Sequence, residues 1–208
     1  MTTKQDHYYI AFEGPIAAGK TTLATLLATA IGGDLILEAF NANEFLADFY
    51  NDRDRWALPM QLWFFSSRFP ALRDVPASLS RPLVADYTHR KDSLFARLLL
   101  RGRELRLFEQ ISALPRQHIT SPDLIVYLDA RNEVLLQRIR SRGRPYDLSI
   151  DCSYLDRLRA AYDKDLEAGT TRSSILRFET SDLNLQSEKE MTEFYQSVMF
   201  SASDAASA

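Results

Sequence analysis

The chain has 208 residues, of which 46% are hydrophobic and 25% charged, a composition typical of a globular protein with a proper core. Its net charge of -3 argues against a general nucleic-acid coat, and no apolar run approaches the ~20 residues of a membrane span. Because its single cysteine excludes an internal disulfide and its N-terminus lacks the apolar core of a secretion signal, we expect a cytoplasmic protein that binds neither nucleic acid nor a membrane.

Short apolar runs predict buried strands, and longer segments with helical spacing separate them. In chain order the strands are expected at 8–13, 34–38, 82–86, 123–129 and 174–179, and the helices at 20–31, 55–69, 92–114, 132–141 and 153–167. Continuous apolar strands separated by helices indicate an α/β fold whose parallel sheet is covered on both faces. Since no repeat or linker interrupts the chain, residues 1–200 are predicted to form a single domain, and residues 201–208 a disordered tail.

The first four predicted strands share one feature, which is an acidic residue at the carboxyl end. These residues are Glu13, Glu38, Asp86 and Asp129. In open parallel sheets ligands bind beyond the carboxyl ends of the strands. We therefore expect the functional site at this edge, with Asp129 in a structural or nucleotide-side role because its strand leads straight into an arginine-rich helix.

The first predicted strand runs into GPIAAGKT, residues 14–21, which fits the pattern G-x-x-x-x-G-K-[ST]. Gly14 and Gly19 permit backbone angles and a close approach that a side chain would block. Lys20 would neutralise the β- and γ-phosphates of a nucleotide, and the Thr21 hydroxyl would ligate Mg²⁺. An ordinary glycine turn could also open a helix, but the strand–loop–helix context favours a nucleotide site. The predicted binding residues are Gly14, Pro15, Ile16, Ala17, Ala18, Gly19, Lys20, Thr21 and Thr22.

A second basic segment, LLQRIRSRGRPYD at 135–147, follows the fourth strand. Arg138 and Arg142 are four residues apart and share a helix face, while Gly143 frees the chain before Arg144. These arginines suit a lid that closes over a transferring phosphoryl group. A solvated basic helix end is the alternative, since the helix dipole also favours it. The N-K-x-D sequence of GTPases and the L-S-G-G-Q signature of transporter ATPases are both absent.

Four stretches together resemble the deoxynucleoside kinases: FEGPIAAGKTT, LEAFNANEFLADFYNDRDRWALPMQLWFFSSRF, LVADYTHRKDSLFA and RIRSRGRPYD. The resemblance runs from about Tyr9 to Leu166, and its nearest branch is the bacterial purine deoxynucleoside kinases. It implies a P-loop kinase fold, with a five-stranded parallel sheet flanked by helices and an arginine-rich lid. It also implies a homodimer that phosphorylates the 5′-hydroxyl of a deoxynucleoside with ATP and Mg²⁺.

Carried over to this chain, the resemblance makes Glu38 the carboxylate that receives the 5′-hydroxyl proton, although a strand-end acid could simply cap the next helix. It makes Gln61 the base-reading amide and Arg68 the base-pocket arginine. An amide offers a donor beside an acceptor, which matches adenine but also cytosine and, when flipped, guanine. Gln61 alone therefore does not determine which base the protein binds.

Three further residues take roles from the resemblance. Tyr50 and Asp147 fall where the family holds the sugar 3′-hydroxyl, with Asp147 in place of a more usual glutamate. Phe95 aligns with the aromatic residue that stacks on the base, and an apolar core role is equally compatible with its position.

One departure from the family pattern concerns the acid-Arg-Ser triplet after the third strand. The chain reads ADYTHRK, so that Asp86 keeps the acid, as a predicted partner of Mg²⁺, but Tyr87 stands in place of the arginine. Arg90 or Lys91 is expected to supply the absent cation.

The leading interpretation is an ATP-dependent deoxynucleoside kinase with a purine acceptor, deoxyadenosine being favoured. A thymidylate-type monophosphate kinase is an alternative, for which Arg53, Arg55 and Arg68 would be the acceptor-side cations. A nucleotide-binding regulator without transfer activity is a third interpretation, which the Asp-Tyr departure keeps open. The oligomeric state cannot be deduced from the residues alone.

Overall fold

The computed structural model describes residues 7–75, 79–116, 118–144, 147, 150–168 and 173–207. Its strands are β1 (Tyr9–Glu13), β2 (Asp34–Ile36), β3 (Leu83–Ala85), β4 (Leu124–Asp129) and β5 (Ser174–Glu179). Its helices are α1 (Lys20–Ile31), the 3-10 turn η1 (Phe40–Ala42), α2 (Leu46–Asn51), α3 (Arg53–Arg73), α4 (Arg90–Leu99), α5 (Gly102–Arg116), α6 (Asn132–Arg142), α7 (Cys152–Glu167) and α8 (Glu188–Ser207). The strands form one five-stranded sheet in the order β2-β3-β1-β4-β5, and every pairing is parallel, as the sequence predicts.

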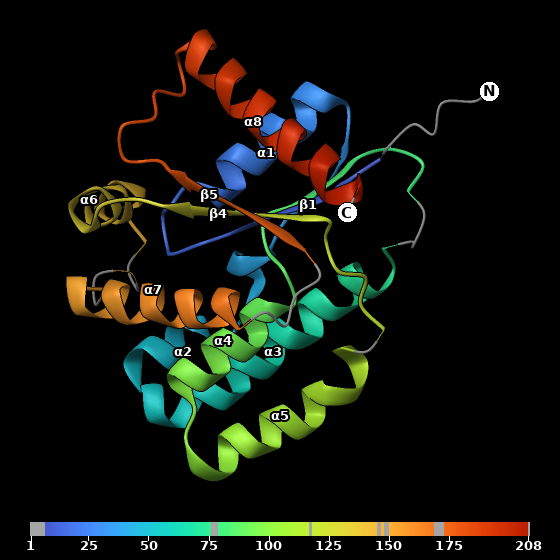
Figure 1. Cartoon of the computed structure of the whole chain (residues 1–208). Coiled ribbons are helices and arrows are strands. Elements are labelled where there is room, and N and C mark those ends of the chain that lie inside the picture. The colour runs from blue at the N-terminus through green and yellow to red at the C-terminus, as the bar shows by residue number, and fades with distance from the viewer. Residues whose placement is uncertain are drawn as a thin grey trace.

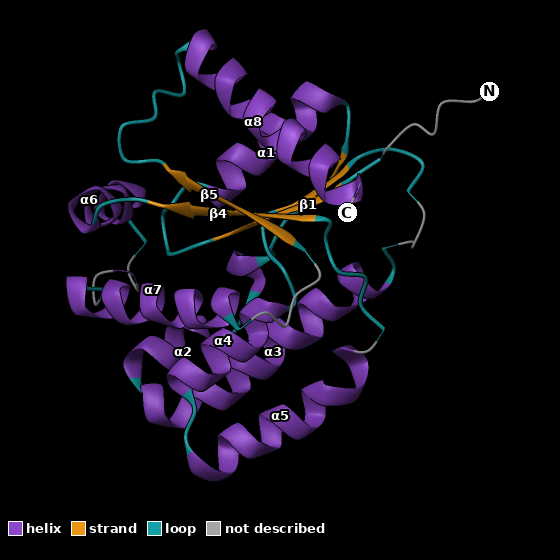
Figure 2. Ribbon diagram, viewed as in Figure 1, coloured by secondary structure: helices purple, strands orange, loops and turns teal. Residues whose placement is uncertain are grey.

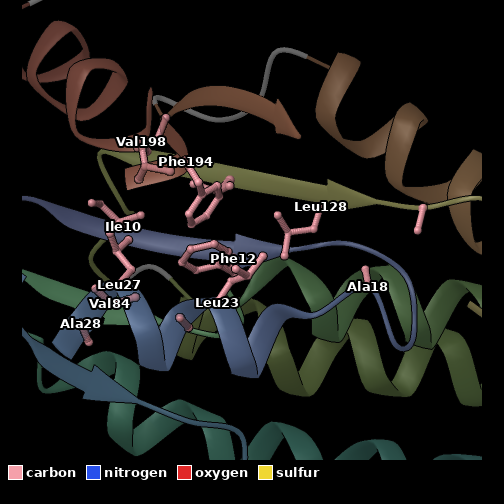
Figure 3. Close-up of a cluster of buried hydrophobic side chains, with 14 of the residues drawn as sticks. Ile10, Phe12, Ala18, Leu23, Leu27, Ala28, Val84, Leu128, Phe194 and Val198 are labelled. Atoms are coloured by element: carbon pink, nitrogen blue, oxygen red, sulfur yellow. The ribbon is translucent and has the colours of Figure 1, made fainter. Parts of the chain in front are cut away.

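Both faces of the sheet are covered because alternate residues of the central strands point to opposite sides. On β1, Ile10 and Phe12 belong to the core beneath α1 and α8, which Figure 3 shows at close range. Tyr9 and Ala11 face the other way and pack with Leu72 of α3. Figure 1 shows the same layering, with α1 and α8 on one side of the sheet and α3, α4 and α7 on the other.

A second apolar core holds helices α2, α3, α4 and α5 together on the side of the sheet away from α1 and α8 (Figure 2). Aromatic rings dominate it: Phe65 lies edge-on to Phe108, with 6.1 Å between the ring centroids. This helical layer begins with α2 and α3, which follow β2 in the chain. Its packing therefore determines the positions of Tyr50, Gln61 and Arg68, the residues predicted to bind the nucleoside, relative to the sheet.

The expected helix at 92–114 is in fact two helices, α4 and α5. The break lies at Leu100, whose backbone is extended (φ -92°, ψ 155°), followed by Gly102 in the left-handed region at φ 52°. Periodicity alone missed the break because Leu98 and Leu105, on its two sides, are seven residues apart, as they would be on one face of a continuous helix. The strand at 174–179 was expected to be buried, but β5 is an edge strand and is largely exposed.

The expected disordered tail at 201–208 is also corrected, because α8 continues through Ser207. Buried Met191, Phe194, Val198 and Ala202 recur at spacings of three and four, which places them on one face of the helix. This face packs on the sheet, and because Ala202 is buried with it, the helix is stabilised beyond residue 200. Within the described part of the chain, no helix is both long and apolar enough to cross a membrane.

Candidate active site

A cavity of about 790 Å³ opens beyond the carboxyl ends of the strands, where the sequence places the site. Every strand of the sheet is followed by residues that line it, so the cavity is built by the sheet edge as a whole. The contributions come from residues 16–23 after β1, residues 37–42 after β2, Asp86 and Lys91 after β3, Arg138, Arg142, Arg144 and Asp147 after β4, and Thr180, Leu183 and Leu185 after β5, together with Tyr50 of α2.

The loop between β1 and α1 has the backbone that its glycines predict. Gly14 lies at φ 135°, and a Cβ there would come within 2.0 Å of the Leu128 carbonyl oxygen on β4. Gly19 lies at φ 101° and opens α1, and Ala17 is in the left-handed region at φ 65° despite its side chain. Strain of this kind persists where the surroundings enforce it, often at binding sites. Of the nine predicted loop residues, Gly14 and Pro15 are not among those that line the cavity.

Lys20 lies along this loop, with its ammonium 2.8 Å from the Gly14 carbonyl oxygen and 2.7 Å from that of Pro15. Burial, with the neighbouring charge of Lys91, lowers the pKa of Lys20 to about 8. An anion placed against the loop would therefore strengthen the charged form of the lysine. This is the electrostatic environment of a phosphate site.

Asp86 joins the phosphate loop to the segment that carries Glu38. One of its oxygens accepts the Thr21 hydroxyl at 2.6 Å, and the other accepts the backbone N–H of Glu38 at 2.8 Å. A hydroxyl beside a carboxylate fits Mg²⁺, which takes few protein ligands and keeps water and phosphate oxygens. The described residues contain no group of three or more His, Cys, Asp or Glu side chains that could hold a metal by themselves.

Glu38 lies two residues past β2 and is held between two cations. Its Oε1 accepts from Arg68, with Nε at 2.8 Å, and its Oε2 accepts the Lys91 ammonium at 2.7 Å. Burial alone would raise the pKa of Glu38, but Arg68 and Lys91 outweigh it and hold that pKa well below its usual range. Glu38 is therefore an ionised carboxylate fixed in one orientation at the wall of the cavity.

Arg68 binds two acidic residues, and its role in the base pocket stays a prediction. Its guanidinium bonds Glu38 on one side and the buried Asp92 on the other, and it stacks over Phe64 with 4.5 Å to the ring centroid. Sequence reasoning did not assign Asp92, although it directly follows Lys91.

Gln61 and Phe95, like Arg68, are not among the described residues that line the cavity. Gln61 is 2% exposed, and its Oε1 has no hydrogen-bond partner in the described structure. Phe95 lies with its ring centroid 5.8 Å from the Lys91 ammonium. Their base-reading and stacking roles stay predictions.

Of the two cations expected to replace the missing arginine, the structure brings only Lys91 to the site. The Arg90 side chain turns to α7, where Nε donates to Asp165 at 2.8 Å. Lys91, one residue on, is 8% exposed, lines the cavity and bonds Glu38.

The three predicted lid arginines all line the cavity but make separate contacts. Arg138 donates to the backbone oxygen of Thr180 at 2.6 Å and to that residue's hydroxyl at 3.0 Å, and burial lowers the pKa of Arg138. Arg142 pairs with the buried Asp147, with 2.5 Å between Nη2 and Oδ2. Arg144 stacks over Phe40 at 4.6 Å. Pro145 and Tyr146 of the predicted lid lie outside the described residues.

Tyr50 and Asp147, the predicted sugar-binding pair, both line the cavity. Burial and the nearby Asp147 charge raise the pKa of Tyr50, so its phenol stays protonated and able to donate. Asp147 keeps one oxygen on Arg142. Their contact with a sugar stays a prediction.

Thr180 is a further cavity residue that sequence reasoning left unassigned. Its hydroxyl lies 3.0 Å from the carbonyl oxygen of Ala18 in the phosphate loop and 3.0 Å from that of Asp129 at the end of β4. Asp129 itself accepts from Arg159 of α7 at 2.7 Å and is not among the described residues that line the cavity. Of its two predicted roles, structural or nucleotide-side, the structural one is compatible with this position.

Comparison with known proteins places this geometry in a family. The sequence profile of the deoxynucleoside kinase family matches residues 10–199. The chain is similar to the deoxyguanosine kinase of Bacillus subtilis, with 35% identity over 74% of this chain and 76% of the relative. It is also similar to the deoxyadenosine kinase of Dictyostelium discoideum, with 32% identity over 84% of this chain and 73% of the relative.

The fold has solved counterparts as well. A structure of deoxyadenosine kinase from M. mycoides with bound dATP superposes with a TM-score of 0.79, over 93% of this chain and 100% of that one, at 18% identity. The match confirms the predicted P-loop kinase fold, and the profile and the relatives confirm the resemblance. The chain belongs to the deoxynucleoside kinase family.

Proposed function

We propose that this protein transfers the γ-phosphoryl group of ATP to the 5′-hydroxyl of a deoxynucleoside, with a purine as acceptor and deoxyadenosine favoured. The observation that carries the proposal is the placement of Lys20 and Glu38 on the walls of one cavity. Asp86 links the two sides through Thr21 and the Glu38 backbone. A phosphate donor and a hydroxyl acceptor can thus meet between them.

The role of Glu38 follows from its charge and its partners. Two cations hold its pKa well below the usual range, which makes it a poor acceptor for a full proton. As a fixed acceptor, however, it can aim the 5′-hydroxyl at the phosphorus atom. Phosphoryl transfer passes through a loose transition state, so positioning and charge stabilisation provide most of the catalysis.

The phosphates would be held by the loop, by Lys20 and by the cavity wall that carries the arginines after β4. Thr21 and Asp86 would hold Mg²⁺, which when bound neutralises phosphate charge. Arg138, Arg142 and Arg144 are well placed to contact the transferring group or the ATP phosphates, since all three line the cavity. Thr180 supports this wall by binding Arg138.

A purine acceptor is supported by the relatives, which are a deoxyguanosine kinase and a deoxyadenosine kinase, and the Gln61 side chain is compatible with adenine. Its buried Oε1 lacks a partner and would accept the amino group of adenine, while its amide nitrogen would donate to the adjacent ring nitrogen. Guanine would instead require the flipped amide, with its nitrogen donating to O6 and its oxygen accepting from the adjacent ring N–H. The cation of the same helix, Arg68, is held by Glu38 and Asp92.

A thymidylate-type acceptor is less well supported. Its phosphate would need cations on the acceptor side, and the candidates were Arg53, Arg55 and Arg68. Arg53 stacks over Phe49 and Arg55 over Trp56, and none of the three is among the described cavity residues.

We further infer a homodimer in the cytoplasm. Helix α5 packs on α3 through its buried side and exposes Leu107 and Ile111, at 45% and 43%, on the other. Apolar residues one turn apart suit a second copy of the chain. Light scattering of the wild type and of Ile111→Asp tests this: we expect a dimeric wild type and a monomeric variant, and a monomeric wild type would contradict the inference.

The cytoplasmic location is inferred from the cysteine content. The lone cysteine, Cys152, is compatible with a reducing compartment.

The experiment that tests the transfer is a substrate panel. The four deoxynucleosides, the matching ribonucleosides and dTMP are each incubated with radiolabelled ATP and Mg²⁺, and labelled products are separated. We expect the highest kcat/KM with deoxyadenosine. Preference for deoxyguanosine would overturn only the base assignment, whereas label on dTMP alone would favour the monophosphate kinase. ATP binding with no labelled product would favour the regulator.

A further inference from the structure

Glu13, the last residue of β1, is a buried carboxylate that the proposed transfer does not use. It is 2% exposed and directly precedes Gly14, whose carbonyl oxygen accepts the Lys20 ammonium. Its Oε1 accepts the Thr88 backbone N–H at 2.8 Å and the Thr88 hydroxyl at 2.7 Å. Its Oε2 accepts the Tyr162 hydroxyl at 2.9 Å. Three donors on one carboxylate satisfy it, and all three come from outside its own strand.

Thr88 in turn organises the start of α4. Its hydroxyl oxygen accepts the Arg90 backbone N–H at 3.2 Å, and its carbonyl oxygen accepts the Lys91 backbone N–H at 3.3 Å. These are the first orphan donors of the helix, which side chains at a helix start commonly satisfy. The hydrogen bonds from Thr88 to Glu13 therefore fix the start of α4, and with it the position from which the Lys91 side chain extends.

Lys91 carries this position to the reacting side of the cavity, where its ammonium lies 2.7 Å from Glu38. Hydrogen bonds thus connect Glu13 to Thr88, Thr88 to the backbone of Lys91, and the Lys91 ammonium to Glu38. Glu13 is also joined through the backbone to Gly14, the first residue of the phosphate loop. Burial raises the pKa of Glu13, and the charge of Lys91 and the Thr88 bonds offset part of that rise. The carboxylate is thus tied electrostatically to the same lysine.

We propose that Glu13 is a positioning residue, which acts through Thr88 to place Lys91 against Glu38 and to keep this pair in register with the phosphate loop. The proposal rests on the proposed phosphoryl transfer. Small displacements of an orienting group lower turnover strongly even when binding is unchanged. A loss of position should therefore appear in kcat and leave KM largely unaltered.

The first test compares substitutions that keep or remove the acceptor oxygens. Glu13→Met removes both oxygens at similar length, and Glu13→Gln retains one for Thr88. We expect kcat to fall at least about tenfold in Glu13→Met and less than about threefold in Glu13→Gln, with KM for both substrates within about threefold. Should Glu13→Met not fold, Thr88→Val and Thr88→Ser form an equivalent pair, since only serine keeps the hydroxyl. Asp123→Asn is the matched control: the Asp123 carboxylate lies just before β4, where its Oδ2 accepts the Tyr9 backbone N–H at 2.8 Å, and this variant should keep kcat within about twofold.

A double-mutant cycle separates positioning from a general effect on the fold. If Thr88 acts through Lys91, adding Thr88→Val to Lys91→Met should lower kcat no further, because the connection from Lys91 to Glu38 is already lost. Equal losses in both backgrounds would overturn the proposal, as would folded Glu13→Met and Thr88→Val proteins with wild-type kcat.

Amide hydrogen exchange gives a readout that needs no turnover. Exchange at Thr88 and Lys91 should be at least about tenfold faster in Glu13→Met than in the wild type, and unchanged in Asp123→Asn. Unchanged exchange in Glu13→Met would overturn the positioning role. A wild type that fails to turn over any acceptor would overturn the transfer instead, so the two failures are distinguishable.

Discussion

The substitution Glu38→Gln addresses the centre of the proposed mechanism while it keeps the shape of the side chain. Glu38 accepts from Arg68 through one oxygen and from Lys91 through the other. An amide has a single acceptor oxygen, so either Arg68 or Lys91 must face an N–H₂ group. The neutral amide also removes the Glu38 charge from both cations, but Arg68 keeps Asp92 as a counter-charge, whereas Lys91 loses the carboxylate that it binds.

The cost to stability can be bounded from this geometry. Leaving one partner of a buried ion pair uncompensated costs about 3 kcal/mol, at the lower end of the usual range because Lys91 can turn toward the cavity. For a chain of this length that corresponds to a fall of about 6–12 °C in Tm. Glu133→Gln, an exposed acid at the start of α6, is the matched control and should change Tm by less than about 2 °C.

Activity should fall for a separate reason. Loss of the carboxylate that aims the 5′-hydroxyl should lower kcat by at least about 100-fold, with the nucleoside KM within about threefold. The assay is steady-state ADP release at 20 °C with saturating ATP and deoxyadenosine, after circular dichroism has shown that the variant is folded. A folded Glu38→Gln protein with kcat within about twofold of wild type would refute the role of Glu38. So would a rise in nucleoside KM as large as the fall in kcat, since that would indicate simple binding.

The remaining predictions concern the base, the loop and the metal. Gln61→Ala should raise the nucleoside KM at least about tenfold with little change in the KM for ATP, because a buried base edge would lack its partners. Initial-rate kinetics with each substrate varied in turn measure both KM values. An unchanged nucleoside KM would show that Gln61 does not contact the base. Gly14→Ala should lower Tm by about 4–12 °C, because the new Cβ would lie 2.0 Å from the Leu128 carbonyl oxygen. Gly32→Ala is the control: a Cβ there has nothing within 4 Å, so this variant should lose only about 1 kcal/mol of stability through left-handed backbone strain. Equal falls in Tm for the two variants would argue against the clash at Gly14. Thr21→Val should raise the Mg²⁺ concentration for half-maximal activity at least about tenfold, and an unaltered magnesium titration would remove Thr21 from the metal site.

The elements of the sheet could be predicted from the sequence because their signals are local. A strand buried on both faces needs a continuous apolar run, and the phosphate loop needs glycines at Gly14 and Gly19 whatever packs around them. Parallel pairing then brings the carboxyl ends to one edge, which is why Glu38 and Asp86 were correctly expected near Lys20. The break between α4 and α5 could not be predicted in this way, because it changes the chain direction without interrupting the apolar spacing.

Only the tertiary structure decided which charged side chains meet. Arg90 and Lys91 are neighbours on one helix, but successive residues project about 100° apart, so the rotation of α4 directs Lys91 to Glu38 and Arg90 to Asp165. That rotation is set by the packing of α4 on α3 and α7, and by the hold of Glu13 on Thr88. The types of residue needed for transfer were visible along the chain, whereas their pairing depends on helix orientations that long-range packing alone determines.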